Sequence, residues 1–234
     1  MEQERALDER FPFLKEKGHV ISIVGAGGKT TLMNAMAHVY QGRGQKVLIT
    51  TTTHIMRPLD CPVGESMEEV SRLLKGHGIV AAGTEAPEGK LQRPEWLDLE
   101  ICRELAAAVI VEADGAKHFP CKVPLDTEPV IVEECDIVLG VLGMDAVGRP
   151  LKDVCFRREQ AMRMLGVGES HLMTAEDMAV ILTSERGTRK HVEDRDYWVV
   201  LNKCSTKLRR QQADQIEAQA ERRGLSRERI VRLI

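Results

Sequence analysis

Short runs of consecutive apolar residues alternate along the chain with longer segments in which apolar residues recur every three or four positions. Runs such as AAVIVEAD and WVVLN are typical of strands buried on both faces of a sheet. They predict strands at Val20–Val24, Lys46–Thr51, Gly78–Ala82, Ala107–Glu112, Ile137–Leu142, Trp198–Leu201 and Arg229–Leu233. The periodic segments predict helices at Lys29–Tyr40, Met67–Lys75, Trp96–Ala106, Arg158–Leu165, Ala175–Thr183 and Lys207–Arg223. This alternation predicts an α/β fold with a mostly parallel sheet flanked by helices.

Two stretches do not follow the alternation. GTEAPEGKLQRPEW, residues 83–96, is rich in turn residues, with two prolines and two glycines, and we expect it to cross the surface before the next helix. Residues 115–136 form an irregular excursion from the end of a strand, where long loops often carry function. Because no repeat or linker divides the sequence, we expect a single domain over residues 1–234.

Composition and charge narrow the functional classes. The 33 Lys and Arg against 36 Asp and Glu leave a net charge of −3, which predicts no nucleic-acid or anionic-membrane partner. The first twenty residues are too charged for a secretory signal, and no apolar run approaches the roughly 18 residues of a membrane span. We therefore expect a cytoplasmic protein without a membrane partner. The 6 cysteines contain no C-x-x-C pair, which disfavours a zinc knuckle or a redox dithiol.

A glycine-rich loop joins the first predicted strand to the first predicted helix. The sequence GAGGKTT, Gly25–Thr31, ends like a phosphate-binding loop but is two residues shorter than G-x-x-x-x-G-K-[ST]. Glycines permit the turn, and backbone amides and a helix N-terminus favour an anion. We predict that nucleotide phosphate contacts the loop, with Lys29 on phosphate oxygens and Thr30 or Thr31 offering a hydroxyl to Mg²⁺. The predicted phosphate-binding residues are Gly25, Ala26, Gly27, Gly28, Lys29, Thr30 and Thr31.

Two acidic residues follow the strand in VIVEADGAK. Glu112 and Asp114 are two positions apart, so they share one face where the chain is extended. Ligands gather at the carboxyl ends of strands in open α/β sheets. We predict that both carboxylates hold Mg²⁺ or orient an attacking water, together with Lys29 as the catalytic set and Thr30 as a further metal ligand. An Asp-Gly turn with a solvated glutamate is the alternative.

Two further strand ends offer polar groups. LITTTTHI places Thr52, Thr53 and His54 where they could meet a ligand or Mg²⁺, although threonine also suits strands sterically. VVLNKCS resembles the N-K-x-D signature that reads guanine, with Asn202 and Lys203 expected beside the base. Ser205 replaces the aspartate, and a hydroxyl cannot accept the base bidentately, so the choice between ATP and GTP stays open. The alternative is a strand followed by a helix that Ser205 caps.

Other reactive side chains have two readings. Arg157 or Arg158 could reach a phosphate as an arginine finger does, or could lie at an exposed basic helix start. Cys121 could be a thiol nucleophile, although a small buried residue is the more usual role of cysteine.

Seven blocks in order give the chain its resemblance to a known family. VISIVGAGGKTTLM, VLITTTTHI, GKLQRPEW, VIVEADGAKHFPCKVP, EPVI, GMDAVGRPL and VVLNK resemble the YqeC family, over nearly the whole chain. The resemblance implies a P-loop NTPase-like protein that assists the maturation of selenium-dependent molybdenum hydroxylases, with such a hydroxylase or its cofactor as partner. It assigns phosphate to Gly25, Gly27, Gly28, Lys29 and Thr30, and the acidic motif to Glu112 and Asp114. Ser205 departs from the aspartate that family members often carry.

The short loop also resembles that of Mur-type amide ligases, which carry further domains for which this chain has no room. The leading hypothesis is a Mg²⁺-dependent enzyme, an NTPase or phosphotransferase that uses ATP or GTP. The alternatives are a nucleotide-gated escort without turnover and a small-molecule kinase in which Arg157 or Arg158 covers the transferred phosphate.

Overall fold

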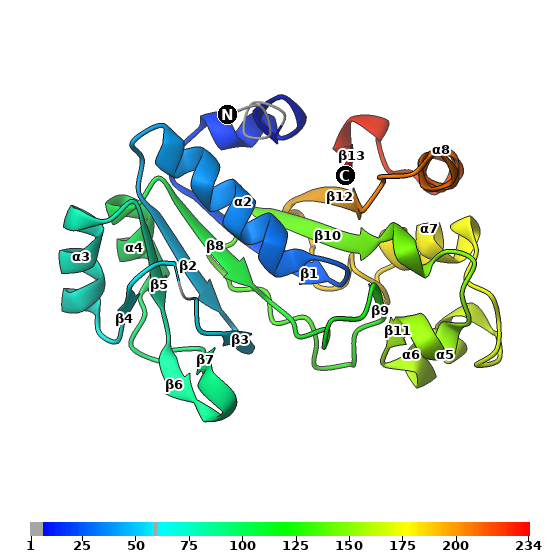
Figure 1. The fold of residues 1–234 in the computed structure, drawn as a ribbon, viewed down its shortest axis with the longest axis horizontal. Helices are drawn as coiled ribbons and strands as arrows, with labels where there is room; N and C mark the ends of the chain where they lie inside the picture. The colour runs from blue at the N-terminus through cyan, green and yellow to red at the C-terminus, as the bar shows by residue number, and fades with distance from the viewer. Residues whose placement is uncertain (1–6, 59) are drawn as a thin grey trace. The chain divides into compact units, whose positions relative to one another are not determined.

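The structure is a computed structural model that describes residues 7–58 and 60–234 (Figure 1). Within these residues it is an α/β protein whose main sheet has eight strands, flanked by helices, consistent with a P-loop NTPase-like fold. The chain forms two compact units. The first contains the described residues up to 23, with 30–115 and 131–137, and the second contains 24–29, 116–130 and 138–234. The single domain expected over the whole chain stays a prediction.

Five parallel strands organise the first unit. Their order is β1-β8-β2-β5-β4, and all four neighbouring pairs are parallel, with Ile21 opposite Ile110 and Leu48 opposite Val109. The side chains of β2 and β8 are buried throughout, as the continuous apolar runs predict. The strands span His19–Gly25 (β1), Val47–Thr51 (β2), Val63–Gly64 (β4), Ile79–Ala82 (β5) and Ala108–Glu112 (β8).

Side-chain caps fix where the helices of the first unit begin. Ser66 accepts a hydrogen bond from the Glu69 amide at the start of α3, and Asp98 accepts one from Ile101 at the start of α4. The cap at Asp98 explains why α4 begins later than the expected Trp96. The helices span Lys29–Gly42 (α2), Met67–Gly76 (α3) and Leu99–Leu105 (α4), and a 3₁₀ helix, η1, covers Pro12–Lys15.

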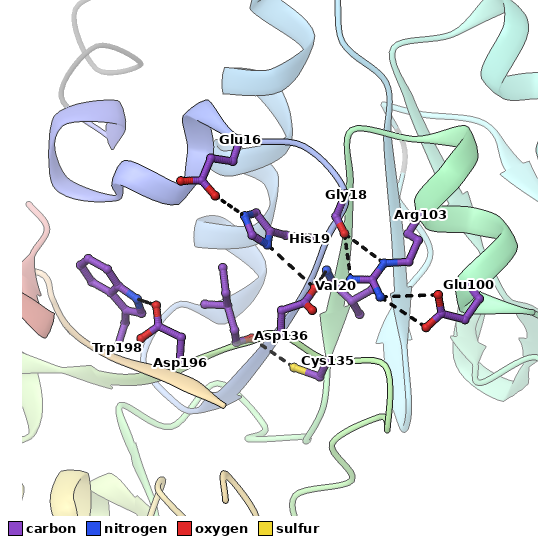
Figure 2. A network of polar contacts seen from close by, with 11 residues as sticks. Glu16, Gly18, His19, Val20, Glu100, Arg103, Cys135, Asp136, Asp196 and Trp198 are labelled. Carbon is purple, nitrogen blue, oxygen red and sulfur yellow. Dashed lines mark hydrogen bonds and ion pairs between the residues drawn. The ribbon is translucent and has the colours of Figure 1, made fainter. Parts of the chain in front are cut away.

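A polar network anchors the start of β1, the strand that leads to the glycine loop (Figure 2). Asp136 accepts hydrogen bonds from the Val20 amide at 2.8 Å and from the Arg103 guanidinium at 2.6 Å. Arg103 also donates twice to the Gly18 carbonyl, at 3.0 and 2.9 Å. One arginine of α4 therefore holds both the chain entering β1 and the carboxylate that caps it.

Residues 83–96 lie mostly at the surface and contain short strands that the hydrophobic pattern did not indicate. They form an antiparallel hairpin of β6 (Thr84–Ala86) and β7 (Lys90–Gln92), and β3 (His54–Met56) pairs with the other side of β7. The turn contains the 3₁₀ helix Pro87–Gly89 (η2), with positive φ at Glu88 and Gly89, and Leu91 of β7 is fully buried. Strands of three residues are too short to show alternation, so only the turn residues Pro87 and Gly89 were visible in the sequence.

The second unit contains three strands of the main sheet, in the order β13-β12-β10, of which β12 and β13 are paired in parallel. Two-residue strands, β9 and β11, form a separate parallel pair. Thr174 and Asp177 cap α7 reciprocally, and α7 packs on α8. The strands span Cys121–Lys122 (β9), Ile137–Gly143 (β10), Cys155–Phe156 (β11), Asp196–Asn202 (β12) and Ile230–Arg232 (β13). The helices span Leu151–Val154 (α5), Arg158–Leu165 (α6), Ala175–Thr183 (α7) and Lys207–Arg222 (α8), with 3₁₀ helices at Met144–Ala146 (η3) and Arg227–Arg229 (η4).

All the strands and helices predicted from the hydrophobic pattern are present, with ends shifted by a few residues. The pattern missed the shortest elements, β3, β4, β6, β7, β9, β11 and α5. Between residues 115 and 136 the structure has only β9 as regular structure.

Candidate functional site

Three glycines shape the loop between β1 and α2. Gly25, Gly27 and Gly28 have φ of 92°, 81° and 127°, a backbone conformation that residues with a Cβ atom rarely adopt. A Cβ at Gly25 would lie 2.3 Å from the Val141 carbonyl oxygen, and one at Gly27 would lie 2.2 Å from the Gly143 nitrogen. Both the backbone angles and the close approach of β10 therefore require glycine in this turn.

Backbone hydrogen bonds hold the loop in place within the second unit. The Ala26 amide donates to the Val141 carbonyl at 2.8 Å, and the Gly27 amide donates to the Phe119 carbonyl at 3.0 Å. These two amides point at protein carbonyls in this structure, so a bound phosphate would meet the amides that follow them. The expected phosphate contacts of Ala26 and Gly27 stay predictions.

Lys29 folds back over the loop. Its amine donates to the Gly25 carbonyl at 2.8 Å, and its side chain is buried, with 4% of the residue exposed. Helix α2 begins at Lys29, and the first amides of an α-helix have no carbonyl partner within the helix. The lysine therefore lies where the loop and the helix start meet.

Asn202 is the last residue of β12 and is bonded to the loop, and Lys203 follows it. Asn202 donates its side-chain amide to the Gly27 carbonyl at 2.8 Å, and a Cβ at Gly28 would lie 2.2 Å from the same nitrogen. The Lys203 amine donates to Asp145 at 2.7 Å. Of the Asn-Lys pair predicted from the sequence, Asn202 therefore contacts the glycine loop, whereas Lys203 is held by Asp145.

Ser205 does not cap the helix that follows it, which corrects the alternative reading of VVLNKCS. Thr206 is the N-cap of α8, and its hydroxyl accepts from the Arg209 amide at 3.2 Å. The nearest side-chain contact of Ser205 is a long one of 3.5 Å to the Arg209 guanidinium. Thr206 has extended backbone angles, φ −103° and ψ 159°, so the cap falls one residue later than expected.

The first unit contains the other predicted set. Thr30 donates its hydroxyl to Glu112 at 2.8 Å, although the two residues are 82 positions apart in sequence. Glu112 and Asp114 are both buried, with 7% and 2% of each residue exposed, while Thr30 and Thr31 are exposed. Hydroxyl and carboxylate oxygens are the ligands that Mg²⁺ prefers, so the Thr30–Glu112 pair has suitable chemistry for that ion.

The threonine run is mostly occupied with structural bonds. Thr50 donates to the Ala82 carbonyl at 2.9 Å, and Thr51 donates to the Glu112 carbonyl at 2.9 Å. The Thr53 amide donates back to the Thr51 hydroxyl at 3.0 Å, and His54 is exposed on β3. Thr51 therefore supports the backbone that carries Glu112.

A small cavity adjoins this run. It is lined by Thr50, Thr51, Thr52, Arg93, Pro94, Leu97, Leu99, Val111, Val132 and Glu134. Its volume of ≈ 30 Å³ gives room for roughly one or two water molecules. A nucleotide base does not fit there.

The two arginines of FRRE differ in their surroundings. Arg158 is exposed and pairs with Glu159 at 3.1 Å, as a residue at a solvated helix start would. Arg157 is partly buried, pairs with Glu128 at 3.3 Å and lies over the Phe156 ring with 4.6 Å between the guanidinium carbon and the ring centroid. Of the two, Arg157 has the fixed position.

Cys121 is fully buried on β9, directly opposite Cys155 on β11. A hydrogen bond with Cys155, followed by burial, raises the pKa of the Cys121 thiol well above its ordinary value. The thiolate is the nucleophilic form, so these surroundings favour the small buried residue over the nucleophile.

Sequence reasoning missed two carboxylates, Asp145 and Glu128, which pair with the candidate residues Lys203 and Arg157. Asp145, on η3, holds Lys203, and it lies within GMDAVGRPL, where only the Met-Asp pair after an apolar strand could have signalled it. Glu128, in the excursion, pairs with the fully buried Lys122 at 3.0 Å. No local spacing links Glu128 to Arg157, so the sequence carries no sign of this contact.

Two searches of the described residues found nothing further. In residues 7–58 and 60–234, no cluster of three or more His, Cys, Asp and Glu side chains suits a metal ion. Over the same residues, none of the helices combines the length and the apolar character that crossing a bilayer requires.

Comparison with known proteins places the chain in a family. The family described as "YqeC protein" matches residues 21–159, which include the glycine loop, Glu112, Asp114 and Arg157. The chain is also 31% identical over 181 residues to the protein named "Uncharacterized protein YqeC" from Escherichia coli (strain K12), an alignment that covers 74% of this chain and 71% of that one. The chain belongs to the YqeC family.

Proposed function

We propose that the chain binds the phosphates of ATP or GTP through the loop Gly25–Thr31. The observation that carries this proposal is the loop itself, in which three glycines take positive φ and pack against β10 and Asn202, with buried Lys29 over the turn. The three glycine positions carry no side chain, so the backbone there can approach an anion closely. A turn that only joins a strand to a helix does not require three glycines with positive φ within four residues.

Thr30 and Glu112 are the residues that would hold Mg²⁺. Their hydroxyl and carboxylate oxygens are 2.8 Å apart, and Lys29 and Thr30 are consecutive in sequence. Mg²⁺ would neutralise charge on the phosphate oxygens. Asp114, buried two residues after Glu112, supplies a second carboxylate on the same segment.

The reaction that these groups support is hydrolysis or transfer of the terminal phosphate. Lys29 balances phosphate charge, and Glu112 or Asp114 accepts a hydrogen bond from the attacking water or hydroxyl and so orients it. Phosphoryl transfer depends almost entirely on such positioning and charge stabilisation. We assign the chain to the Mg²⁺-dependent NTPases or phosphotransferases on this basis.

The cellular role that we propose is maturation of a selenium-dependent molybdenum hydroxylase. Its support is membership of the YqeC family together with the resemblance of the seven sequence blocks. In a host that makes such a hydroxylase, removal of the gene should lower hydroxylase activity. The intact gene should restore that activity and a Lys29→Ala version should not, and equal restoration by both would contradict the role.

Calorimetric titration with ATP and GTP, each with and without Mg²⁺, tests nucleotide binding. Lys29→Ala should weaken binding by about 10–100-fold, since charged hydrogen bonds contribute about 1.5–3 kcal/mol and each 1.4 kcal/mol is tenfold. Lys75→Ala, at an exposed lysine of α3, is the matched control and should bind as the unmodified protein does. Equal binding by both variants, with both folded by circular dichroism, would rule out the loop as the phosphate site.

Release of inorganic phosphate distinguishes an enzyme from a nucleotide-gated escort. Glu112→Gln keeps the shape of the side chain and a hydrogen-bond acceptor for Thr30, but removes the charge. If Glu112 serves turnover, the variant should release phosphate at least about 100-fold more slowly, in line with the loss of a general base. An escort would bind nucleotide tightly and release no phosphate with either protein.

A further inference from the structure

Three cations surround one aromatic ring in the second unit. The Lys117 and Lys122 amines each lie 5.8 Å from the centroid of Phe156, and the Arg157 guanidinium carbon lies 4.6 Å from it. Glu128 pairs with Lys122 at 3.0 Å and with Arg157 at 3.3 Å. We call Lys117, Lys122, Glu128, Phe156 and Arg157 the Phe156 cluster.

Phe119 links the Phe156 cluster to the glycine loop. Phe119 stacks on Phe156 with 5.9 Å between ring centroids and 25° between their planes. The carbonyl of Phe119 accepts the hydrogen bond of the Gly27 amide. One residue therefore contacts both the aromatic ring under the cations and the turn where we propose that phosphate binds.

The backbone of the cluster is strained at both outer cations. Arg157 has φ of 65° and Lys117 has φ of 46°, values that residues other than glycine rarely adopt. The Nε atom of Arg157 is also buried without a hydrogen-bond partner in the part of the chain that the structure describes. Positive φ at two cationic residues and this buried, unpaired nitrogen at one of them are costly for stability, and such costs are often found at functional sites.

The positions of Lys117 and Arg157 leave them accessible. Lys117 is exposed and makes no ion pair among residues 7–58 and 60–234. Arg157 has 36% of its side chain exposed, and its bond to Glu128 is long for a charged pair. The cation–π contact with Phe156 holds the guanidinium in position without neutralising its charge, as a close carboxylate would.

We propose that Lys117 and Arg157 bind a phosphate-like oxyanion. This site adds an anion-binding position to the proposed nucleotide site. It rests on the proposed function in one respect, because we take the oxyanion to be part of the nucleotide reaction at the glycine loop. The oxyanion could belong to the terminal phosphate of the nucleotide or to a separate anionic substrate. Both sources offer the same chemistry, oxygens that accept from a guanidinium and an ammonium group.

Four substitutions test the site. Arg157→Gln and Lys117→Gln remove one charge each, and Lys117 is exposed, so its variant should fold even if the Arg157 variant does not. Arg158→Gln and Lys152→Gln are matched controls at exposed residues close in sequence. The probes are inorganic phosphate and the diphosphate and triphosphate of one nucleoside, adenosine or, where ATP does not bind, guanosine, each titrated with all five proteins.

We expect each test variant to weaken one probe by about tenfold relative to its control, the effect of one lost charged hydrogen bond. Weaker triphosphate binding with unchanged diphosphate binding assigns the site to the terminal phosphate. Weaker phosphate binding with both nucleotides unchanged assigns it to a separate substrate. Test variants that match their controls with every probe would overturn the site.

The outcome also separates this site from the proposed function. If the unmodified protein bound no nucleotide but bound phosphate through Lys117 and Arg157, the proposed function would fail and the oxyanion site would stand. If nucleotide bound normally and neither variant mattered, the reverse would hold. Binding of none of the probes by the unmodified protein would overturn both.

Discussion

At the scale of single residues, the loop depends on backbone freedom that only glycine supplies. Gly27 has φ of 81°, and a Cβ there would overlap the Gly143 backbone. Gly148, in the same unit, has φ of 82°, but a Cβ there would meet nothing within 4 Å. The two glycines thus differ in packing and not in backbone angle.

Gly27→Ala should therefore destabilise the protein more than Gly148→Ala. Both substitutions carry the conformational cost of about 1–2 kcal/mol for a left-handed residue. Gly27→Ala adds the overpacking cost of about 1–3 kcal/mol. Urea unfolding of both variants measures the difference, and equal free energies of unfolding would show that the loop yields to the added methyl group.

Glu128 gives a pH-dependent prediction at the same scale. Burial alone would raise the pKa of Glu128, but hydrogen bonds from Lys122, Leu125 and Arg157 lower that pKa below its ordinary value. A carboxyl whose pKa is lower in the folded state contributes stability above its unfolded pKa of about 4.3. That contribution is lost as the pH falls through the folded pKa.

Glu128→Gln should lower the free energy of unfolding near neutral pH by about 1–3 kcal/mol, the usual cost of removing one partner from a buried hydrogen-bonded group. The loss should shrink as the pH falls, because protonation of Glu128 removes the same charge from the unmodified protein. Glu169→Gln, at an exposed glutamate, is the control. A loss of the same size at every pH would argue that shape and not charge matters at Glu128.

At the scale of elements, α8 begins with a cap that can be separated from its neighbour. Thr206 accepts from the Arg209 amide, whereas Ser205 makes only a long side-chain contact. Thr206→Ala should cost about 1 kcal/mol of the free energy of unfolding, and Ser205→Ala should stay within about 0.5 kcal/mol. Denaturant titration of the two variants checks this, and a larger loss for Ser205→Ala would reverse the assignment of the cap.

Elements differ in how far the sequence predicts them, for physical reasons. The strand Ala108–Glu112 is buried on both faces, so its apolar run is continuous and visible. The strands of the 84–92 hairpin have three residues each and depend on pairing with β3 from elsewhere in the chain. Local pattern cannot show a partner that is distant in sequence, and this is also why Glu128 and Asp145 were missed.

The same limit applies to the site. The glycine loop could be predicted because its residues are consecutive and each has a local conformational reason. The Thr30–Glu112 bond joins two motifs whose residue types, a hydroxyl and a carboxylate, suit the same ion, so their shared chemistry is visible in the sequence although their distance is not. The Phe156 cluster gathers residues from positions 117 to 157 around one ring, and no spacing rule applies to such a set.

At the scale of the whole molecule, nucleotide binding should raise the free energy of unfolding and with it the Tm. A ligand that binds only the folded chain stabilises it by about 2.7 kcal/mol at one hundred times its Kd. For a chain of 234 residues each kcal/mol raises the Tm by about 2–4 °C, so Mg²⁺ with the preferred nucleotide should raise it by about 5–10 °C. Lys29→Ala should lose about half of this shift or more, as the roughly 10–100-fold weaker binding requires, and Lys75→Ala should keep it, because only the first removes a charge from the loop. A full shift in Lys29→Ala would mean that nucleotide binds away from Gly25–Thr31, whereas an equal shift without Mg²⁺ would contradict a contribution of Mg²⁺, held by Thr30 and Glu112, to nucleotide binding.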